Sequence, residues 1–173
     1  MPDIASFKMN HVALSMYPNE IEGTRRKEIL HFYQDVFGWG EYEEDERSVE
    51  EFSRELSSLI HEDAPKIPPL ILLTPAMHFI YLYAVPKPMS GTPVDHFGFE
   101  VDSEEELDAV LSRAKDFRLR DEEVGIVDKA ITNYKVPDEL LGKMPGTSVD
   151  LINCYISYRL PMAVEVQYYR WHA

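Results

Sequence analysis

Two histidines occupy matching places in two stretches of alternating apolar and polar residues. His96 lies in "VDHFGFEV" (94–101), and His11 lies in "FKMNHVALSM" (7–16), 85 positions earlier. Residues that alternate in this way form half-buried β-strands, whose successive side chains point to opposite faces. An imidazole is a poor filler for a small core but a common ligand for metal ions. The pattern therefore raises the question of what a histidine does on one face of each strand.

The segments that follow each strand repeat in the same order. "TRRKEILHFYQDVFGW" places one apolar stripe along a helix between Thr24 and Gly38, and "SEEELDAVLSRAKDF" does the same with Ser103 and Glu106 in capping-box spacing. Three strand-like segments complete each copy. They are residues 40–44, 69–75 and 78–85 in the first copy, with an inserted amphipathic helix from Ser48 to about Ile60, and 127–136, 149–160 and 162–171 in the second. Each half therefore predicts a strand, a helix and three strands.

Composition narrows the class of protein. The chain has 173 residues, 45% of them hydrophobic, which is enough to bury a core. Its 17 basic and 31 acidic residues give a net charge of −14, which disfavours nucleic acids and anionic membranes as partners. The single cysteine, Cys154, excludes an intrachain disulfide, and no signal pattern opens the sequence, so we expect a cytoplasmic protein. The longest apolar run, residues 70–73, is far too short to span a bilayer.

The repeated unit and its order resemble the vicinal oxygen chelate superfamily, which includes glyoxalase I, methylmalonyl-CoA epimerase, fosfomycin-resistance proteins, extradiol dioxygenases and bleomycin-binding proteins. The resemblance implies an α+β fold in which two βαβββ modules pair into a cupped, open mixed β-barrel with helices on the convex side. It covers nearly the whole chain as a single domain, 1–173. The modules would span about 7–85 and 94–171, joined by the Pro/Gly-rich connector "PKPMSGTP" (86–93).

The resemblance also implies a ligand set. Members of the family hold a divalent metal ion on the concave face through the first and last strands of each module, and His11, His96 and Glu165 in "AVEVQYY" match those positions. Strand parity agrees, because valine, leucine or phenylalanine flanks each of the three on the opposite face. Two imidazoles and a carboxylate suit an open site for one divalent ion, with Fe, Mn or Zn the expected metals.

Other histidines and a fourth ligand are weaker candidates. A lone histidine in a strand is more often a core or surface residue than a ligand, and we expect His31, His61 and His172 to be solvated. Glyoxalase-like members place a fourth ligand in the last strand of the first module. Subtracting 85 from Glu165 gives Ile80, which cannot coordinate, whereas slips of one and two give Tyr81 and His78. The three-ligand arrangement of the dioxygenase and fosfomycin-resistance branches is favoured. Tyr81 and His78 stay open as possible fourth ligands.

Parity also predicts polar residues that line the cup. In "NCYISYR", one face carries Asn153, Tyr155, Ser157 and Arg159, of which Tyr155 and Arg159 are the predicted catalytic residues. The alternative is that this face points to solvent on the convex side. The turn "YRLPMAVE" departs from the Asp-Pro-Asp-Gly type that many members carry before the final glutamate, so no branch of the family is indicated.

Two classes of function follow. The first is a metal-dependent dioxygenase, lyase or isomerase acting on vicinal oxygen atoms of a small organic substrate, with the ion as Lewis acid. The second is a metal-free protein of the bleomycin-resistance type that binds a small drug or antibiotic, for which the net charge of −14 would suit a cation. In both cases we expect a homodimer, because exposed sheet edges invite pairing and family members are commonly dimers.

Overall fold

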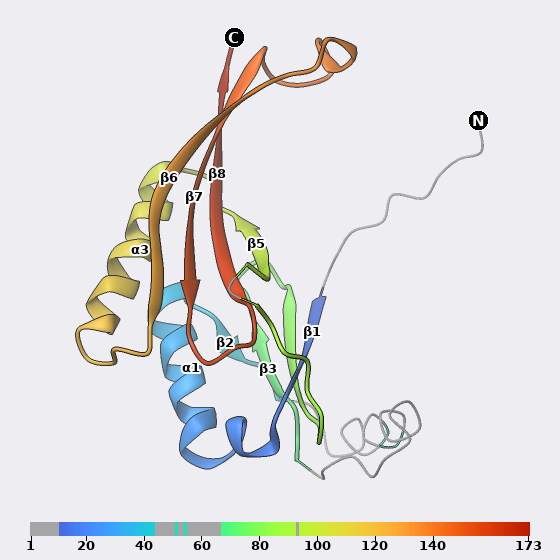
Figure 1. Cartoon of the computed structure of the whole chain (residues 1–173), viewed down its shortest axis with the longest axis vertical. Helices are drawn as coiled ribbons and strands as arrows, with labels where there is room; N and C mark the ends of the chain where they lie inside the picture. The colour runs from blue at the N-terminus through green and yellow to red at the C-terminus, as the bar shows by residue number, and fades with distance from the viewer. Residues whose placement is uncertain (1–10, 44–50, 52–53, 55–66, 93) are drawn as a thin grey trace. The chain divides into compact units, whose positions relative to one another are not determined.

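The computed structural model of the chain describes residues 11–43, 51, 54, 67–92 and 94–173. The chain divides into two compact units, Met1–Met89 and Ser90–Ala173. In both units the described elements run strand, helix and three strands, which confirms the α+β fold and the repeated βαβββ order (Figure 1). The pairing of the two modules into one cupped barrel, and their union in a single domain, stay predictions.

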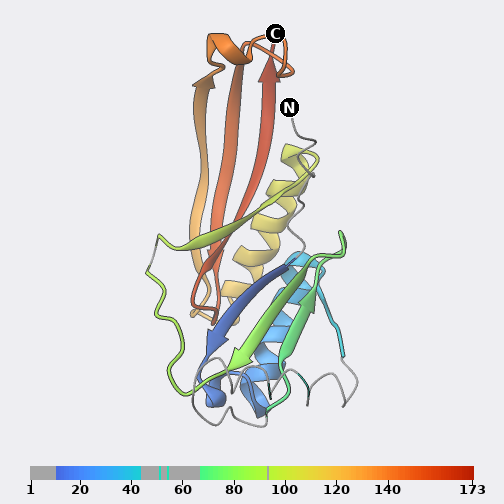
Figure 2. The same cartoon turned by 90° about the vertical axis from the view of Figure 1, so that its right-hand side faces the viewer.

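Within its described residues, the first unit contains a four-stranded sheet and the helix α1 (Gly23–Phe37), which packs against it. Its elements are β1 (His11–Met16), a 3-10 turn (Pro18–Glu20), α1 (Gly23–Phe37), β2 (Gly40–Glu41), β3 (Leu70–Leu73) and β4 (Phe79–Ala84). The sheet order is β1-β4-β3-β2, and only β1 and β4 are parallel (Figure 2). Helix α1 ends at Phe37 and is capped by Gly38, whose φ of 72° suits glycine because it has no β-carbon.

Two expected segments of this unit extend beyond the described residues. The predicted strand 7–16 is confirmed from His11 onward, and residues 7–10 lie outside the described part. The predicted helix from Ser48 to about Ile60 also lies outside it, apart from Glu51 and Arg54.

The second unit repeats the first, and its last three strands are longer than their counterparts. Its elements are β5 (His96–Glu100), α3 (Glu104–Arg118), β6 (Gly125–Lys135), a 3-10 turn (Asp138–Leu140), β7 (Ser148–Ser157) and β8 (Ala163–His172). The sheet order is β5-β8-β7-β6, with β5 parallel to β8 and the other pairs antiparallel. Figure 1 shows β6, β7 and β8 side by side, with α3 along one face of them. The predicted strands and helix of this half are thus all present.

The start of α3 is capped as its sequence predicts. The Ser103 hydroxyl accepts a hydrogen bond from the Glu106 backbone N–H at 3.2 Å. The Glu106 carboxylate accepts one from the backbone N–H of Asp102 at 3.1 Å, one residue earlier than in the usual capping box. Acidic residues in the first turn and Lys115 and Arg118 in the last turn oppose the helix dipole, which stabilises α3 further.

The core of the second unit lies between α3 and one face of the sheet. The buried face of α3 consists of Leu107, Val110, Leu111, Ala114 and Phe117. The sheet contributes Ile152, Cys154, Ile156, Val164 and Val166, all of them buried. Because strand side chains alternate, the residues between these five point away from the helix. The opposite face of the same strands therefore carries the polar residues Asn153, Tyr155 and Glu165.

Cys154 is expected to be chemically inert in the folded protein. Burial, with smaller contributions from Asp128 and Asp108, raises the pKa of its thiol to about 11. Since only the thiolate is nucleophilic, its reaction with a disulfide reagent near pH 8 should be roughly a hundredfold or more slower than in unfolded protein. Absorbance assays with and without concentrated guanidinium chloride test this, and equal rates would contradict the burial of Cys154.

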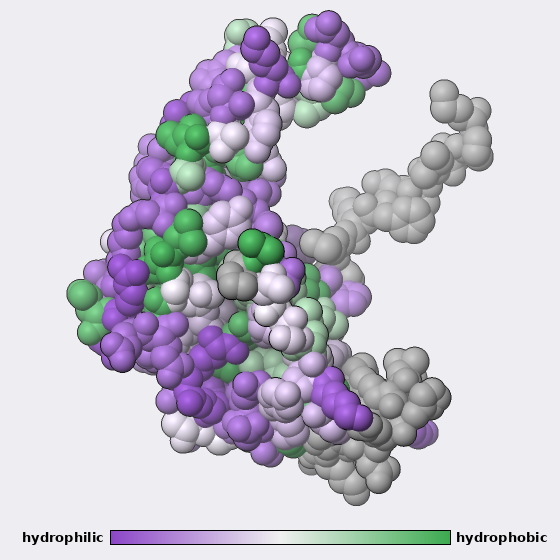
Figure 3. All heavy atoms as spheres, in the orientation of Figure 1, coloured by the Kyte–Doolittle hydropathy of each residue, from purple (hydrophilic) through white to green (hydrophobic). Residues whose placement is uncertain are grey.

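The face seen in Figure 3 carries mostly hydrophilic residues among those described, in keeping with the acidic composition. An exception is the connection between β6 and β7, where Leu140, Leu141 and Met144 are each exposed. No helix within the described residues is long and apolar enough to cross a membrane.

Candidate metal site

His96 and Glu165 lie together on the sheet face opposite α3. His96 begins β5, Glu165 lies on the adjacent β8, and His96 Nε2 is 3.3 Å from Glu165 Oε2. Gly98 is the register partner of Glu165, and a β-carbon placed on it would be 3.4 Å from the same Oε2 atom. The missing side chain at Gly98 therefore leaves space beside the oxygen that faces His96.

The other carboxylate oxygen of Glu165 is held by two donors from β7. Glu165 is only 7% exposed. Its Oε1 atom accepts hydrogen bonds from Asn153 Nδ2 at 2.5 Å and from the Tyr155 hydroxyl at 3.0 Å. Burial, followed by the bond to Glu165, raises the pKa of Tyr155, so its phenol stays a protonated donor near neutral pH. The carboxylate is thus divided: Oε1 is satisfied, and Oε2 faces the imidazole.

The imidazole of His96 is oriented by its own backbone contact. Its Nδ1 atom is 2.8 Å from the carbonyl oxygen of Val94, and since a carbonyl can only accept, Nδ1 carries the proton. In the neutral ring, Nε2 then presents a lone pair to Glu165 Oε2. A buried carboxylate oxygen and an imidazole lone pair repel each other unless a cation lies at this point, either a proton on Nε2 or a metal ion.

The donor set fits a divalent metal ion in part. Two ligand atoms 3.3 Å apart, each at a bond length of roughly 2.1 Å, subtend about 100° at a metal ion, which suits tetrahedral and octahedral coordination. A histidine that donates its other ring N–H to a carbonyl is the usual arrangement for a metal ligand. Among the described residues no group of three His, Cys, Asp or Glu side chains gathers around one point, so His96 and Glu165 supply two ligands.

His11 occupies the corresponding place in the first unit. It begins β1, is exposed, and its ring meets that of Tyr81 edge-on at 5.8 Å between centroids. Two positions after His11, Ala13 pairs with Tyr81, just as Gly98 pairs with Glu165 two positions after His96. Tyr81 is therefore the structural equivalent of Glu165, and the repeat offset between the last strands is one less than between the first strands.

Besides Tyr81, the structure describes the other alternative for a fourth ligand, His78, and the position obtained by simple subtraction, Ile80. Ile80 is fully buried on the opposite side of β4 from Tyr81. His78 precedes β4, and its backbone N–H donates to the Thr74 hydroxyl at 3.0 Å. The place equivalent to Glu165 thus holds a phenol rather than a carboxylate.

Of the two predicted catalytic residues, only Tyr155 lies at this cluster. Arg159 follows the end of β7 at Ser157 and has a left-handed φ of 57°, so strand alternation no longer applies to it. Its guanidinium is 2.7 Å from a Glu123 carboxylate oxygen and 3.5 Å from one of Asp121. Extending the strand pattern two residues too far placed Arg159 on the face of Tyr155.

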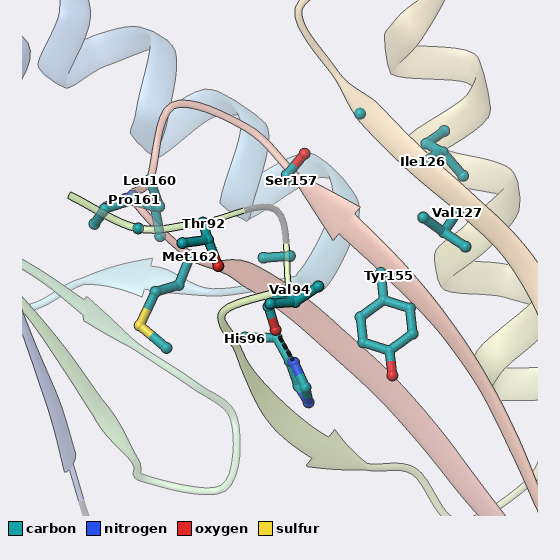
Figure 4. A pocket seen from close by; sticks show the side chains of 13 residues that line it. Thr92, Val94, His96, Ile126, Val127, Tyr155, Ser157, Leu160, Pro161 and Met162 are labelled. Atoms are coloured by element: carbon teal, nitrogen blue, oxygen red, sulfur yellow. Dashed lines mark hydrogen bonds between the residues drawn. The ribbon is translucent and has the colours of Figure 1, made fainter.

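A hollow adjoins the cluster within the second unit. Its volume is about 740 Å³, and His96 and Tyr155 lie side by side in its wall, their rings edge-on at 5.1 Å between centroids (Figure 4). A volume of this size suits a small organic molecule. The cluster therefore has a space beside it in which a ligand could be held.

Sequence reasoning identified Asn153 only as a polar residue on the cup face. Its direct bond to Glu165 could not be read from spacing, because Asn153 pairs in register with Gln167 and reaches Glu165 diagonally. The Val94 carbonyl was missed altogether, since a backbone oxygen carries no signal in the sequence.

Comparisons with known proteins concern the fold. No family model matches the chain, and no curated protein matches its sequence. A glyoxalase family protein from Bacillus anthracis is similar in structure, with a TM-score of 0.53, 13% identity, and coverage of 98% of this chain and 100% of that one. An integron cassette protein from the mobile metagenome of V. cholerae has a TM-score of 0.53 and 11% identity, covering 96% and 98%.

A fosfomycin resistance protein, FosX from Listeria monocytogenes, is also similar. Its TM-score is 0.50 at 14% identity, and the match covers 95% of this chain and 93% of that one. A variant of this Listeria protein has been solved in complex with Mn(II) and 1S,2S-dihydroxypropylphosphonic acid. With its two βαβββ units and these structural relatives, the chain has the fold of the vicinal oxygen chelate superfamily.

Proposed function

We propose that this protein is a metal-dependent enzyme of the vicinal oxygen chelate type that acts on a small oxygenated organic substrate. The observation that carries the proposal is the buried Glu165 carboxylate, whose Oε2 faces the imidazole Nε2 of His96 at 3.3 Å. In the described structure its partners are His96, Asn153 and Tyr155, and none of them is a lysine or an arginine. A buried carboxylate of this kind calls for a cation.

The proposed ligands are His96, Glu165 and His11, with the third completing the set of two imidazoles and one carboxylate. An ion bound there would act as a Lewis acid on adjacent substrate oxygens. Asn153 and Tyr155 fix the carboxylate so that one oxygen is presented, and the Val94 carbonyl fixes the imidazole tautomer. The Mn(II) in the related Listeria complex supports a divalent ion.

Tyr155 and Arg159 have different roles in this proposal. Tyr155 lines the hollow beside His96 and is a protonated donor that could bond a substrate oxygen after releasing Glu165. A catalytic role for Arg159 stays a prediction, and it would require its guanidinium to leave Glu123 and Asp121. The homodimer expected from the sequence belongs to the same proposal.

Mn(II) titration of the purified protein tests the site. Wild-type protein should bind about one ion per chain, and His96→Ala and His11→Ala should each remove most of the binding, because each deletes one of three ligands. Electron paramagnetic resonance measures free Mn(II) directly. His31→Ala is a matched control, because His31 is an exposed histidine on α1 that contacts Asp35 and belongs to neither β1 nor β5.

Equal binding in wild type and both ligand variants would exclude the metal site. The second candidate would then be a metal-free binding protein, which the hollow beside His96 and Tyr155 favours because it could hold a ligand without an ion.

A further inference from the structure

The hollow beside His96 and Tyr155 is lined in an unusual way for so acidic a chain. Its wall includes seven apolar residues, which are Val94, Ile126, Val127, Leu160, Pro161, Met162 and Ala163. Among the described residues that line it, none is Asp, Glu, Lys or Arg, although 28% of the chain is charged. An apolar and uncharged lining favours apolar ligand surface and disfavours a bound anion.

Two of these apolar side chains are strongly exposed. Val94 is 78% exposed and Val127 is 61% exposed. Exposed valines at the mouth of a hollow cost hydration free energy unless something covers them, and a bound apolar group would do so.

The basic residues next to this wall are held elsewhere. Arg159, adjacent to Leu160, pairs with Glu123 and Asp121. Lys129, two residues after Val127, pairs with Glu104 and Asp108 of α3 on the other side of the sheet. Neither cation is therefore directed to the hollow, where it could bind a phosphonate or a carboxylate.

The two ring-bearing polar residues of the hollow, His96 and Tyr155, lie away from Leu160 and Pro161, and Thr92 and Ser157 are the other polar residues of the wall. Figure 4 shows His96 and Tyr155 together at one end and Leu160 and Pro161 at the other, with Val127 beside Tyr155 and Met162 on the opposite wall. A ligand that fits this arrangement places a polar group beside His96 and Tyr155 and apolar surface against Leu160, Pro161 and Met162.

We infer that the site takes an uncharged amphipathic molecule. Its head carries oxygen atoms on two neighbouring atoms, and its aliphatic or aromatic tail fills the hollow between Val127 and Met162. The inference about the head rests on the proposed metal function, whereas the inference about the tail rests only on the apolar lining. The substrate class is thereby distinct from that of a small phosphonate, whose charge calls for lysine or arginine side chains in addition to a metal ion.

Calorimetry with a series of alkanohydroxamic acids tests the tail. Acetohydroxamic, butanohydroxamic and hexanohydroxamic acids share one head, neutral when free near pH 7, whose two oxygens are carried by adjacent atoms, and they differ only in tail length. Binding to Mn(II)-loaded protein should tighten roughly fourfold per added methylene, as apolar burial predicts. Propylphosphonic acid, which carries charge instead, should bind at least about tenfold more weakly than butanohydroxamic acid.

A charge introduced into the wall tests the location. Val127→Arg should weaken hexanohydroxamic acid binding by about tenfold and strengthen propylphosphonic acid binding by a similar factor. Ile131→Arg is a matched control, because Ile131 lies on the same strand, is 57% exposed and does not line the hollow. Both positions are exposed, so neither change should disturb folding.

Each titration is repeated without Mn(II) to separate this inference from the proposed function. An affinity that increases with tail length, with or without the ion, supports the apolar subsite. If the protein binds no Mn(II) but its affinity still increases with tail length, only the metal function is refuted. Mn(II)-loaded protein whose affinity is independent of tail length, or is equally affected by both arginine variants, would overturn the inference. In protein that binds no Mn(II), the absence of a gain would overturn it as well.

Discussion

Glu165→Gln is expected to weaken Mn(II) binding by on the order of a hundredfold or more, beyond the ten- to hundredfold typical of groups that only orient a ligand. The substitution removes the charge from the atom that faces His96 Nε2. It preserves the carbonyl oxygen that accepts from Asn153 and Tyr155, so the local structure should survive. Measurement of free Mn(II) by electron paramagnetic resonance gives the two dissociation constants.

The same variant should behave differently without metal. The introduced amide can donate a hydrogen bond to the lone pair of His96 Nε2, which relieves the repulsion between two acceptors at 3.3 Å. Metal-free Glu165→Gln should therefore have a free energy of unfolding equal to or above that of wild type near pH 8, as urea denaturation measures it. Glu100→Gln, at an exposed position on β5, is the control.

Two results would contradict this account. Unchanged Mn(II) affinity would mean that the cation between His96 and Glu165 is a proton. A clear loss of stability in the metal-free variant would indicate the same, because it would show that an imidazolium–carboxylate pair stabilises the wild-type fold.

Tyr158→Ala is expected to lower the free energy of unfolding by about 3–5 kcal/mol, the usual cost of truncating a buried aromatic residue. Tyr158 is 1% exposed, and its ring lies 5.8 Å from that of Phe117 between centroids. Its hydroxyl donates to Asp121 Oδ2 at 2.7 Å, and the Arg159 guanidinium lies 4.8 Å from the ring centroid. One side chain thus joins the end of β7 to the end of α3.

Tyr158→Phe separates packing from hydrogen bonding. It keeps the ring and removes the donor to Asp121, so it should cost only about 1 kcal/mol. Leu119→Ala is the surface control, since Leu119 is 87% exposed and should change stability by less than about 0.5 kcal/mol. Urea denaturation curves compare the three variants, and a Tyr158→Ala curve that overlays that of Leu119→Ala would contradict the packing described for β7 and α3.

Much of the architecture of this protein follows from local patterns in its sequence. The alternation in "VDHFGFEV" and the apolar stripe from Leu107 to Phe117 each indicate which face of the strand or helix is apolar. That face is the one that the hydrophobic effect buries. The order of elements then repeats, so two βαβββ units could be expected before any tertiary contact was considered. The opposite phases of His96 and Phe97, and of Glu165 and Val164, also belong to this local information.

Tertiary structure decided which of these residues meet. Parity placed Asn153, Tyr155, Ser157 and Arg159 on one face, but the strand ends at Ser157. Arg159 itself has a left-handed φ, and its guanidinium pairs with Glu123. The conformation of a turn depends on how the neighbouring elements pack, and the alternation of residues along a strand carries no information about that packing. Tyr81, rather than Ile80, likewise stands where Glu165 stands in the second unit, because strand pairing and not counting sets the equivalence.

The sequence by itself thus determined the βαβββ repeat and the face on which each polar residue lies, because alternation and helical stripes depend only on neighbours along the chain. Only the tertiary structure decided that Asn153 and Tyr155 bind one oxygen of Glu165 while His96 faces the other. These contacts join residues from β5, β7 and β8, and their distances follow from strand register and from the space left beside Gly98, which are properties of the folded sheet rather than of any one segment.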